Sequence, residues 1–183
     1  AVEGTTPGIS HHNVWFPSDY DAEFDAVFAG RPPADPTIYA CVPDDPLMRP
    51  DSNHESWFVL VNAPRHGQGK REFDWSSREF AKDYADRMLA ALAERGTDLR
   101  ERILWRELIT PADLQDRTGA PGGSIYGTSS NGMRAAFLRP ANTSPIEGLY
   151  LVGGSAHPGG GLPLVGMSAE IVAETIGRAK KRG

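Results

Sequence analysis

Apolar side chains recur at every fourth position between residues 75 and 95, which is the spacing of one face of an α-helix. They are those of Phe80, Tyr84, Met88 and Leu92. Ser76 and, three residues later, Glu79 fit a capping box, and Gly96 is suited to ending a helix. This pattern predicts a helix over residues 75–95.

Two segments, TIYACVP (37–43) and SWFVLVNAP (56–64), are rich in β-branched and aromatic residues. The stretch between them is full of turn-forming residues, so we predict two antiparallel strands joined by a long loop. ILWRELIT (103–110) predicts a further strand, followed by a short helix from Thr110 or Pro111 to Thr118.

A short helix is also predicted over residues 18–30, with Ser18 as its cap and Gly30 at its end. The aromatic residues in and just before this helix are Trp15, Phe16, Phe24 and Phe28. They fit either an exposed apolar patch or ordinary core, and the core interpretation is favoured.

The stretch GLYLVGG (148–154) predicts a strand of a parallel sheet that is covered on both faces, because it lacks polar alternation. A glycine loop and a helix follow, and basic residues gather after the helix, where its dipole favours them. Its apolar stripe consists of Leu164, Met167, Ile171, Val172 and Ile176. The glycines fit either a plain tight turn or a loop that lets backbone approach an anionic ligand, such as a phosphate or a reduced flavin.

Composition narrows the classes of function. A net charge of −5 and a pI near 5.5 argue against nucleic acid as a partner. The single Cys41 excludes an internal disulfide and a cysteine cluster for metal, which favours the cytoplasm. No apolar run could span a bilayer and no signal peptide begins the chain, while the start at Ala1 suggests part of a longer protein.

Several candidate sites are better explained without chemistry. His11 and His12 are adjacent and would point to opposite faces of a strand, so no metal site is predicted. His157 in the glycine loop fits either a functional role or a hydrogen bond to a neighbouring carbonyl. The glycosylation pattern that starts at Asn142 is attributed to chance. The serines of the glycine-rich region lack a hydrolase elbow, and they are Ser124, Ser129 and Ser130.

The segments HHNVWFPSDYDAEFDAVF, DPTIYACVP, GGSIYG, RAAFLRP and GLYLVGGSAHPGGGLPLVGMSAEIVAETI occur in this order. Together they resemble the C-terminal third of bacterial-type phytoene desaturases, FAD-dependent carotenoid desaturases related to the amine oxidases. The resemblance covers nearly the whole chain, and the last segment is its most specific part. The G-x-G-x-x-G motif that would hold a dinucleotide is absent from this chain.

The resemblance implies an α/β fold, with α+β character in its first part, that forms the C-terminal portion of a two-domain FAD-dependent oxidoreductase. Residues 1–110 would belong to the sheet and helices of the substrate domain, and residues 111–147 would connect the domains. Residues 148–183 would supply the last strand and helix of a Rossmann-like FAD-binding domain.

The resemblance also implies where FAD would lie. Gly153 and Gly154 would lie beside the ribityl and pyrophosphate groups. The residues bordering the isoalloxazine ring would be Gly161, Leu162, Pro163, Leu164 and Val165. Related amine oxidases often carry an acidic residue at the position of Gly154, so its absence here leaves backbone N–H groups to contact the flavin chain. No catalytic side chain is assigned.

The implied activity is hydride transfer from an apolar polyene to flavin in a dry channel. The implied partners are a polyene-like substrate and an N-terminal FAD-binding segment or complementary subunit. A cytoplasmic location with peripheral contact at the cytoplasmic membrane is expected, because long polyenes dissolve in lipid. The alternative is a non-catalytic module that binds apolar ligands or docks on a subunit.

Overall fold

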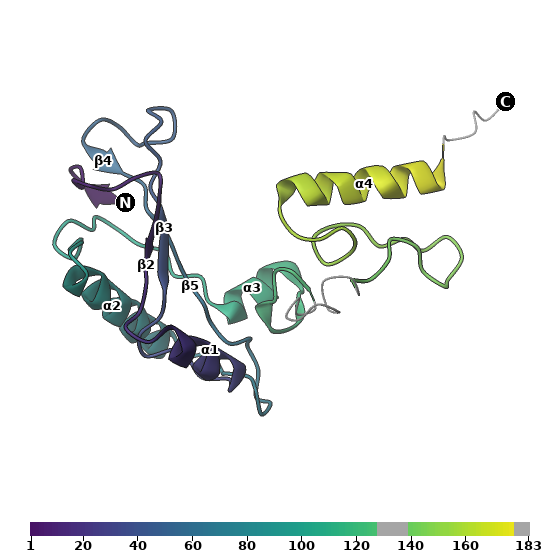
Figure 1. The fold of residues 1–183 in the computed structure, drawn as a ribbon, viewed down its shortest axis with the longest axis horizontal. Helices are drawn as coiled ribbons and strands as arrows, with labels where there is room; N and C mark the ends of the chain where they lie inside the picture. The colour runs from purple at the N-terminus through teal and green to yellow at the C-terminus, as the bar shows by residue number, and fades with distance from the viewer. Residues whose placement is uncertain (128–138, 178–183) are drawn as a thin grey trace. The chain divides into compact units, whose positions relative to one another are not determined.

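The computed structural model describes residues 1–127 and 139–177, and the chain divides into two compact units. Unit 1 is Ala1–Gly123 and unit 2 is Ser124–Gly183 (Figure 1). Unit 1 combines helices with small antiparallel sheets, so it has the α+β character expected for the first part of the chain. Among the described helices, none is long and apolar enough to cross a membrane.

The larger sheet of unit 1 contains three antiparallel strands in the order β2-β3-β5. These are β2 (His12–Trp15), β3 (Ile38–Cys41) and β5 (Phe58–Val61). Both predicted strands of the first half are therefore confirmed, and they pair with Ile38 opposite Val61. A smaller sheet pairs β1 (Val2–Glu3) with β4 (His54–Glu55).

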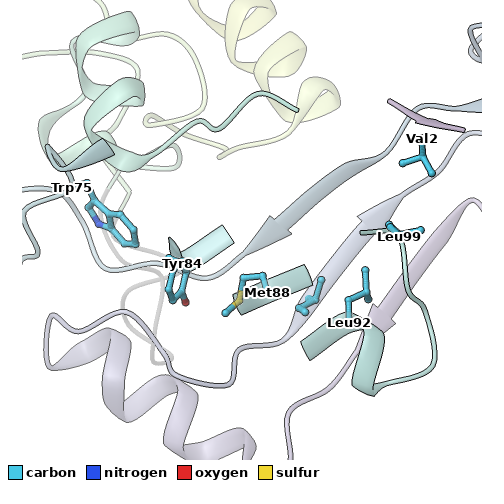
Figure 2. Packing of buried hydrophobic residues seen from close by; sticks show 7 residues of the cluster. Val2, Trp75, Tyr84, Met88, Leu92 and Leu99 are labelled. Carbon is cyan, nitrogen blue, oxygen red and sulfur yellow. The ribbon is translucent and has the colours of Figure 1, made fainter. Parts of the chain in front are cut away.

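Helix α2 (Arg78–Glu94) confirms the strongest periodic pattern of the sequence. Its Tyr84, Met88 and Leu92 are buried in one cluster with Ile38 of the central strand (Figure 2). Burying an apolar side chain of this size contributes about 1.5–3 kcal/mol. The packing of α2 against the inner face of the sheet is therefore the main apolar contact of unit 1.

Both N-caps predicted in unit 1 were placed one residue too early. Helix α2 is capped by Ser77 and not by Ser76, with a 3.2 Å hydrogen bond from a backbone N–H three residues on. Helix α1 (Tyr20–Phe28) is capped by Asp19 and not by Ser18, at 3.0 Å. In each case two adjacent residues have capping chemistry, so the spacing of apolar residues did not decide between them.

Helix α1 is fixed to the sheet by a buried carboxylate. Glu23 accepts hydrogen bonds from the backbone N–H of Thr37 at 2.9 Å and from the Asn62 side chain at 2.9 Å. The aromatic side chains in and just before α1 do not all join the core, because Phe16, which precedes the helix, is 64% exposed and Phe28 is 54% exposed. For these two residues the core interpretation was wrong.

The strand predicted over residues 103–110 is not formed. Ile103 makes one isolated bridge with Val2, and the Leu104 N–H donates to the Ala1 carbonyl at 3.0 Å. Beyond these contacts the segment has no strand beside it in the described part of the chain, and Trp105 is exposed. A β-type composition does not form a strand without a partner to complete the ladder.

Helix α3 (Pro111–Thr118) confirms the next prediction, with Thr110 as its cap and a short 3-10 turn, η1 (Pro121–Gly123), after it. Thr110 and Asp113 form a capping box, since each side chain bonds the other residue's backbone N–H, at 3.3 and 2.8 Å.

In unit 2, helix α4 (Leu162–Ile176) is formed as predicted. The strand predicted at 148–154 is not formed among the described residues of this chain, because the segment makes a single isolated bridge, between Tyr150 and Thr143. A parallel strand requires neighbours on which to form its ladder, and the described residues of unit 2 provide only that bridge. The basic end predicted after α4 lies outside the described residues.

The buried face of α4 also differs from the predicted stripe. Val172 is buried as expected, and Ser168 is completely buried. Leu164, Met167 and Ile176 remain exposed at 37%, 50% and 60%. Helical spacing alone identified an apolar face but not the direction in which it points.

Asp113 links α3 to α2 through two hydrogen bonds from the Arg78 guanidinium, one of them at 3.0 Å. These bonds, assisted by Thr110 and opposed by burial, lower the pKa of Asp113 from 3.8 to about 2. Because the folded-state pKa lies below the unfolded one, the carboxylate stabilises the protein above about pH 4, and this stability is lost as the pH falls toward 2.

We therefore expect Asp113→Asn to lower the free energy of unfolding by about 1 kcal/mol at pH 7. The difference from the wild type should shrink below pH 4 and nearly vanish at pH 2. Urea denaturation across this pH range measures it. Asp116→Asn, an exposed change on the same helix, should stay within about 0.5 kcal/mol of the wild type. A deficit of Asp113→Asn that persists unchanged at pH 2 would contradict this assignment.

Candidate functional site

The start of α4 carries no side-chain cap. Gly161 is the N-cap, with φ +99° and ψ 143°, and Pro163 lies in the first turn. This backbone conformation is one that glycine adopts readily and that residues with a side chain rarely adopt. The Gly161 carbonyl accepts the first helical hydrogen bond, from Val165 N–H at 2.9 Å. The first-turn N–H groups, and the partial positive charge that they carry, remain available to an anionic group.

The glycines of the loop before α4 serve different purposes. Gly153 and Gly161 have positive φ, and a Cβ on either would meet nothing within 4 Å. Gly160, in contrast, lies under the ring of Tyr126, and a Cβ there would fall 1.9 Å from a ring carbon. A Cβ on Gly154 would make near-ordinary contacts, at 3.4 Å or more. Within the loop from Gly153 to Gly161, only Gly153 and Gly161 combine a positive φ with open space at the Cβ position.

The other predicted site residues lie in the first turn of the helix. Leu162 is 89% exposed and Leu164 is 37% exposed. Val165 is half-buried, and its side chain lies 3.7 Å from the position that a Cβ of Gly154 would occupy. The structure thus brings Gly154 and Val165 together, while Leu162 extends away from the loop's own packing.

A buried polar network holds the glycine loop to α4. The Ser168 hydroxyl accepts hydrogen bonds from Gly153 N–H at 3.1 Å and from the Asn142 side-chain amide at 3.0 Å. That amide also lies within hydrogen-bond distance of the carbonyls of Leu151, at 3.0 Å, and His157, at 2.9 Å. Three separate parts of unit 2 therefore meet at Asn142 and Ser168.

Sequence reasoning missed this network. Asn142 was considered only as a glycosylation acceptor, and Ser168 was taken as part of the helix. Arg139, which donates to the carbonyls of Tyr126 at 3.0 Å and Gly154 at 3.1 Å, was not singled out. The available signal was a serine on the apolar side of a helix, because a buried hydroxyl needs a partner.

The outer face of the β2-β3-β5 sheet is a second candidate surface, and it belongs to unit 1. Opposed residues of antiparallel strands share a face, so the strand register identifies its members. They are His12, Val14, Tyr39, Cys41, Phe58 and Leu60. Val14, Phe58 and Leu60 are 48%, 61% and 48% exposed, so an apolar patch lies beside three groups able to hydrogen-bond.

The polar end of this outer face corrects one expectation. His11 and His12 were expected to point apart. Instead, one ring nitrogen of each histidine and the Cys41 Sγ all lie within 4.8 Å of one another. The reason is that β2 begins at His12, so strand alternation does not extend to His11. Tyr39 lies on the same face as Cys41. Its pKa is raised, mainly by desolvation and to a smaller extent by the charge and hydrogen bond of Cys41.

No family model matches the chain. Among known proteins it is 39% identical, over 96% of its length, to a hydroxyneurosporene desaturase of Rubrivivax gelatinosus, of which it covers 33%. It is 35% identical to a carotenoid 3,4-desaturase of Haloarcula japonica and 37% identical to a 4,4'-diapolycopene oxygenase of a Methylomonas species, over 96% of this chain and 35% of each protein.

These comparisons confirm the predicted resemblance to carotenoid desaturases, and the similarity extends across both units. Relatives that share it include enzymes named as desaturases and as oxygenases. The chain spans about a third of the length of the curated relatives that it matches.

The network at Ser168 predicts a local effect. In Ser168→Ala, Gly153 N–H and the Asn142 amide lose a buried acceptor, which costs about 1–3 kcal/mol. We expect the Gly153 amide to exchange with deuterium about tenfold faster or more. Thr175→Ala is the matched control, because it removes a hydroxyl from the exposed side of the same helix and should leave this exchange unchanged. Equal protection of Gly153 in both variants would rule out the network.

Proposed function

We propose that this chain is the C-terminal segment of an FAD-dependent carotenoid desaturase that removes hydrogen from an apolar polyene. The observation that carries the proposal is the similarity to carotenoid desaturases, at 35–39% identity over 96% of the chain. The related oxygenase, at 37% identity, supports the same substrate class and leaves the outcome of oxidation open.

FAD is the cofactor that the glycine loop and the start of α4 would help to hold. The fit rests on the open space beside Gly153 and Gly161 and on the uncapped first turn of the helix. Gly161 would let the isoalloxazine ring approach, and Leu162 and Leu164 would offer it apolar contact and backbone N–H groups. Pro163 has no N–H, so it would contribute packing and a preset helical start.

Gly153 and Gly154 would contact FAD through fewer backbone groups than the sequence suggested, because some of these groups already form hydrogen bonds. The Gly153 N–H already donates to Ser168, so this residue would offer space rather than a hydrogen bond. The Gly154 carbonyl already accepts a hydrogen bond from Arg139. Gly154 would therefore contact the ribityl or pyrophosphate part of FAD through its own backbone N–H. Val165, in the first turn of α4, packs beside Gly154 and would support the glycine loop from the side of the helix.

The outer face of the sheet is the surface proposed for the polyene. Its Val14, Phe58 and Leu60 present apolar groups that no described residue covers well. A hydrocarbon offers no charge to recognise, so orientation must come from shape and from exclusion of water. A bound flavin would supply the acceptor for the hydride, and this chain's residues would position the substrate.

The proposed partner is an N-terminal FAD-binding segment or a complementary subunit. The apolar stretch at Leu149, Leu151 and Val152 is 46%, 39% and 58% exposed, which suits a strand that would complete its ladder on that partner. The alternative of a non-catalytic module is not favoured, because the relatives carry the names of enzymes.

Peripheral contact with a membrane would supply the lipid-soluble substrate. The rings of Phe16, just before α1, and of Tyr20, Phe24 and Phe28 on α1 form a row of edge-to-face or tilted neighbours, with centroids 5.9, 5.1 and 6.2 Å apart. The exposed members of this row could insert among lipid headgroups, but the acidic side chains Asp21 and Asp25 favour a neutral surface over an anionic one.

The flavin proposal is tested at Gly161. In the full-length protein, Gly161→Ala would place a methyl group in the open space beside the helix start and should weaken flavin affinity about tenfold. Flavin absorbance per folded protein, measured during flavin titration, provides the readout.

Gly148→Ala is the matched control for this test. Gly148 also has positive φ, at +78°, and nothing within 4 Å of a Cβ, so its substitution likewise puts a methyl group on a backbone that disfavours side chains. It should reduce stability and leave the flavin content of the folded fraction unchanged. If both variants retain flavin equally, the loop does not face the cofactor.

The substrate proposal is tested at Leu60. Leu60→Asn should lower kcat/KM for a carotenoid in vesicles about tenfold, since burying a leucine contributes about 1.5–3 kcal/mol. Leu47→Asn changes a leucine that is 94% exposed and lies outside the sheet, so it should behave as the wild type does. Unchanged kinetics for Leu60→Asn would remove this face from the substrate path.

A further inference from the structure

Three side chains able to bind a transition metal converge at one end of the outer sheet face. His12 begins β2, Cys41 ends β3, and the two residues are direct partners across the strands. His11 precedes them, and its ring centroid lies 4.6 Å from that of His12. One nitrogen of each imidazole and the Cys41 Sγ all lie within 4.8 Å of one another.

The strand register explains this closeness. The Val42 N–H donates to the His11 carbonyl at 2.8 Å, which is one of the two bonds of a hydrogen-bonded pair and lies just beyond the end of the strand pairing. Such pairs alternate with non-hydrogen-bonded pairs, in which Cα atoms are nearer and side chains closer. His12 and Cys41 are therefore the closer kind of pair, and the backbone itself holds their side chains together.

Hydrogen bonds to both histidines prepare them as ligands. His11 Nδ1 lies 3.1 Å from an Asp44 carboxylate oxygen, and His12 Nδ1 lies 2.8 Å from the Tyr39 hydroxyl. A carboxylate or hydroxyl on one ring nitrogen fixes the orientation of the ring and makes the other nitrogen a better donor to a metal. With each Nδ1–H donating to its oxygen partner, Nε2 is the nitrogen of each ring that would coordinate a metal.

We propose that His11, His12 and Cys41 bind Zn²⁺, with water in a fourth position. Two imidazoles and one thiolate suit this borderline-soft ion better than Mg²⁺ or Ca²⁺, which prefer oxygen ligands. Zinc with nitrogen ligands at about 2.0–2.1 Å and sulfur at about 2.3 Å places neighbouring ligand atoms roughly 3.5 Å apart. Zinc binding would require side-chain rotations that bring the ligand atoms, now within 4.8 Å of one another, to that spacing. On binding, the Cys41 thiol releases its proton to solvent and the Zn–S bond forms.

This site goes beyond the proposed function and does not depend on it. Its ligands are accessible, since His12 is exposed and the His11 side chain is 34% exposed, so an ion can enter from solvent. Asp44, at 76% side-chain exposure, acts as the outer partner that orients His11 rather than as a fixed ligand.

The first experiment uses the purified full-length protein without substitutions. Zn²⁺ is titrated in, and the rate of alkylation of Cys41 by iodoacetamide is followed by mass spectrometry of the peptide that contains it. Bound zinc occupies the thiolate, so we expect alkylation to slow about tenfold or more at saturation. Alkylation at an unchanged rate in the presence of zinc would overturn the proposal.

Variants then identify the ligands. His12→Gln and His11→Gln should each abolish the protection of Cys41 by zinc, while Asp44→Asn should weaken apparent zinc affinity about tenfold. The control is His54→Gln, because His54 forms a comparable histidine–carboxylate pair with Asp51, at 2.8 Å, outside the cluster. It should retain full protection.

Co²⁺ substitution supplies a readout that an altered fold would not imitate. The wild type should show the intense absorption of a cobalt–thiolate bond, and Cys41→Ser should lack it while keeping the wild-type circular dichroism spectrum. If zinc protects Cys41 equally in the His12→Gln and His54→Gln variants, or if Co²⁺ gives no thiolate band, the three residues do not form a metal site.

Discussion

Unit 1 depends on a single constraint, which is that the central strand β3 must bury one of its faces completely. Ile38 and Ala40 have no exposed surface and pack toward α2, so Tyr39 and Cys41 have to point the other way. A one-residue shift in register would expose the core and bury a phenol and a thiol. The same apolar contact that stabilises the fold therefore also fixes which side chains form the outer face.

Unit 2 is organised by a polar contact instead. It has few buried apolar side chains among its described residues, and Asn142 and Ser168 hold its loop and helix together. A buried network of this kind is stable only when its members are satisfied, and no buried side-chain polar atom in the described part of the chain lacks a partner. Unit 1 is thus specified mainly by apolar periodicity and unit 2 mainly by a few hydrogen bonds.

This difference explains which predictions succeeded. The helix at Tyr84, Met88 and Leu92 and the strands at Ile38 and Val61 were predictable because local spacing and burial agree there. The strands expected at 103–110 and 148–154 were not formed, since composition indicates a tendency to pair but does not provide the partner. Residues that act through distant contacts, such as Asn142 with Ser168, leave almost no local pattern, so the glycine loop was located from sequence but its support was not.

The polar network at Asn142 and Ser168 also affects the entropy of ligand binding. A glycine-rich loop loses more conformational entropy on becoming ordered than other sequences do. If the loop were flexible in the free protein, this entropy would be lost when the ligand binds. Here the hydrogen bond to Gly153 and the contacts of Asn142 restrain the loop within the folded chain, on the side facing α4. The ordering cost is met during folding, so a ligand reaching the open side encounters a preorganised surface and retains more of its interaction energy as affinity.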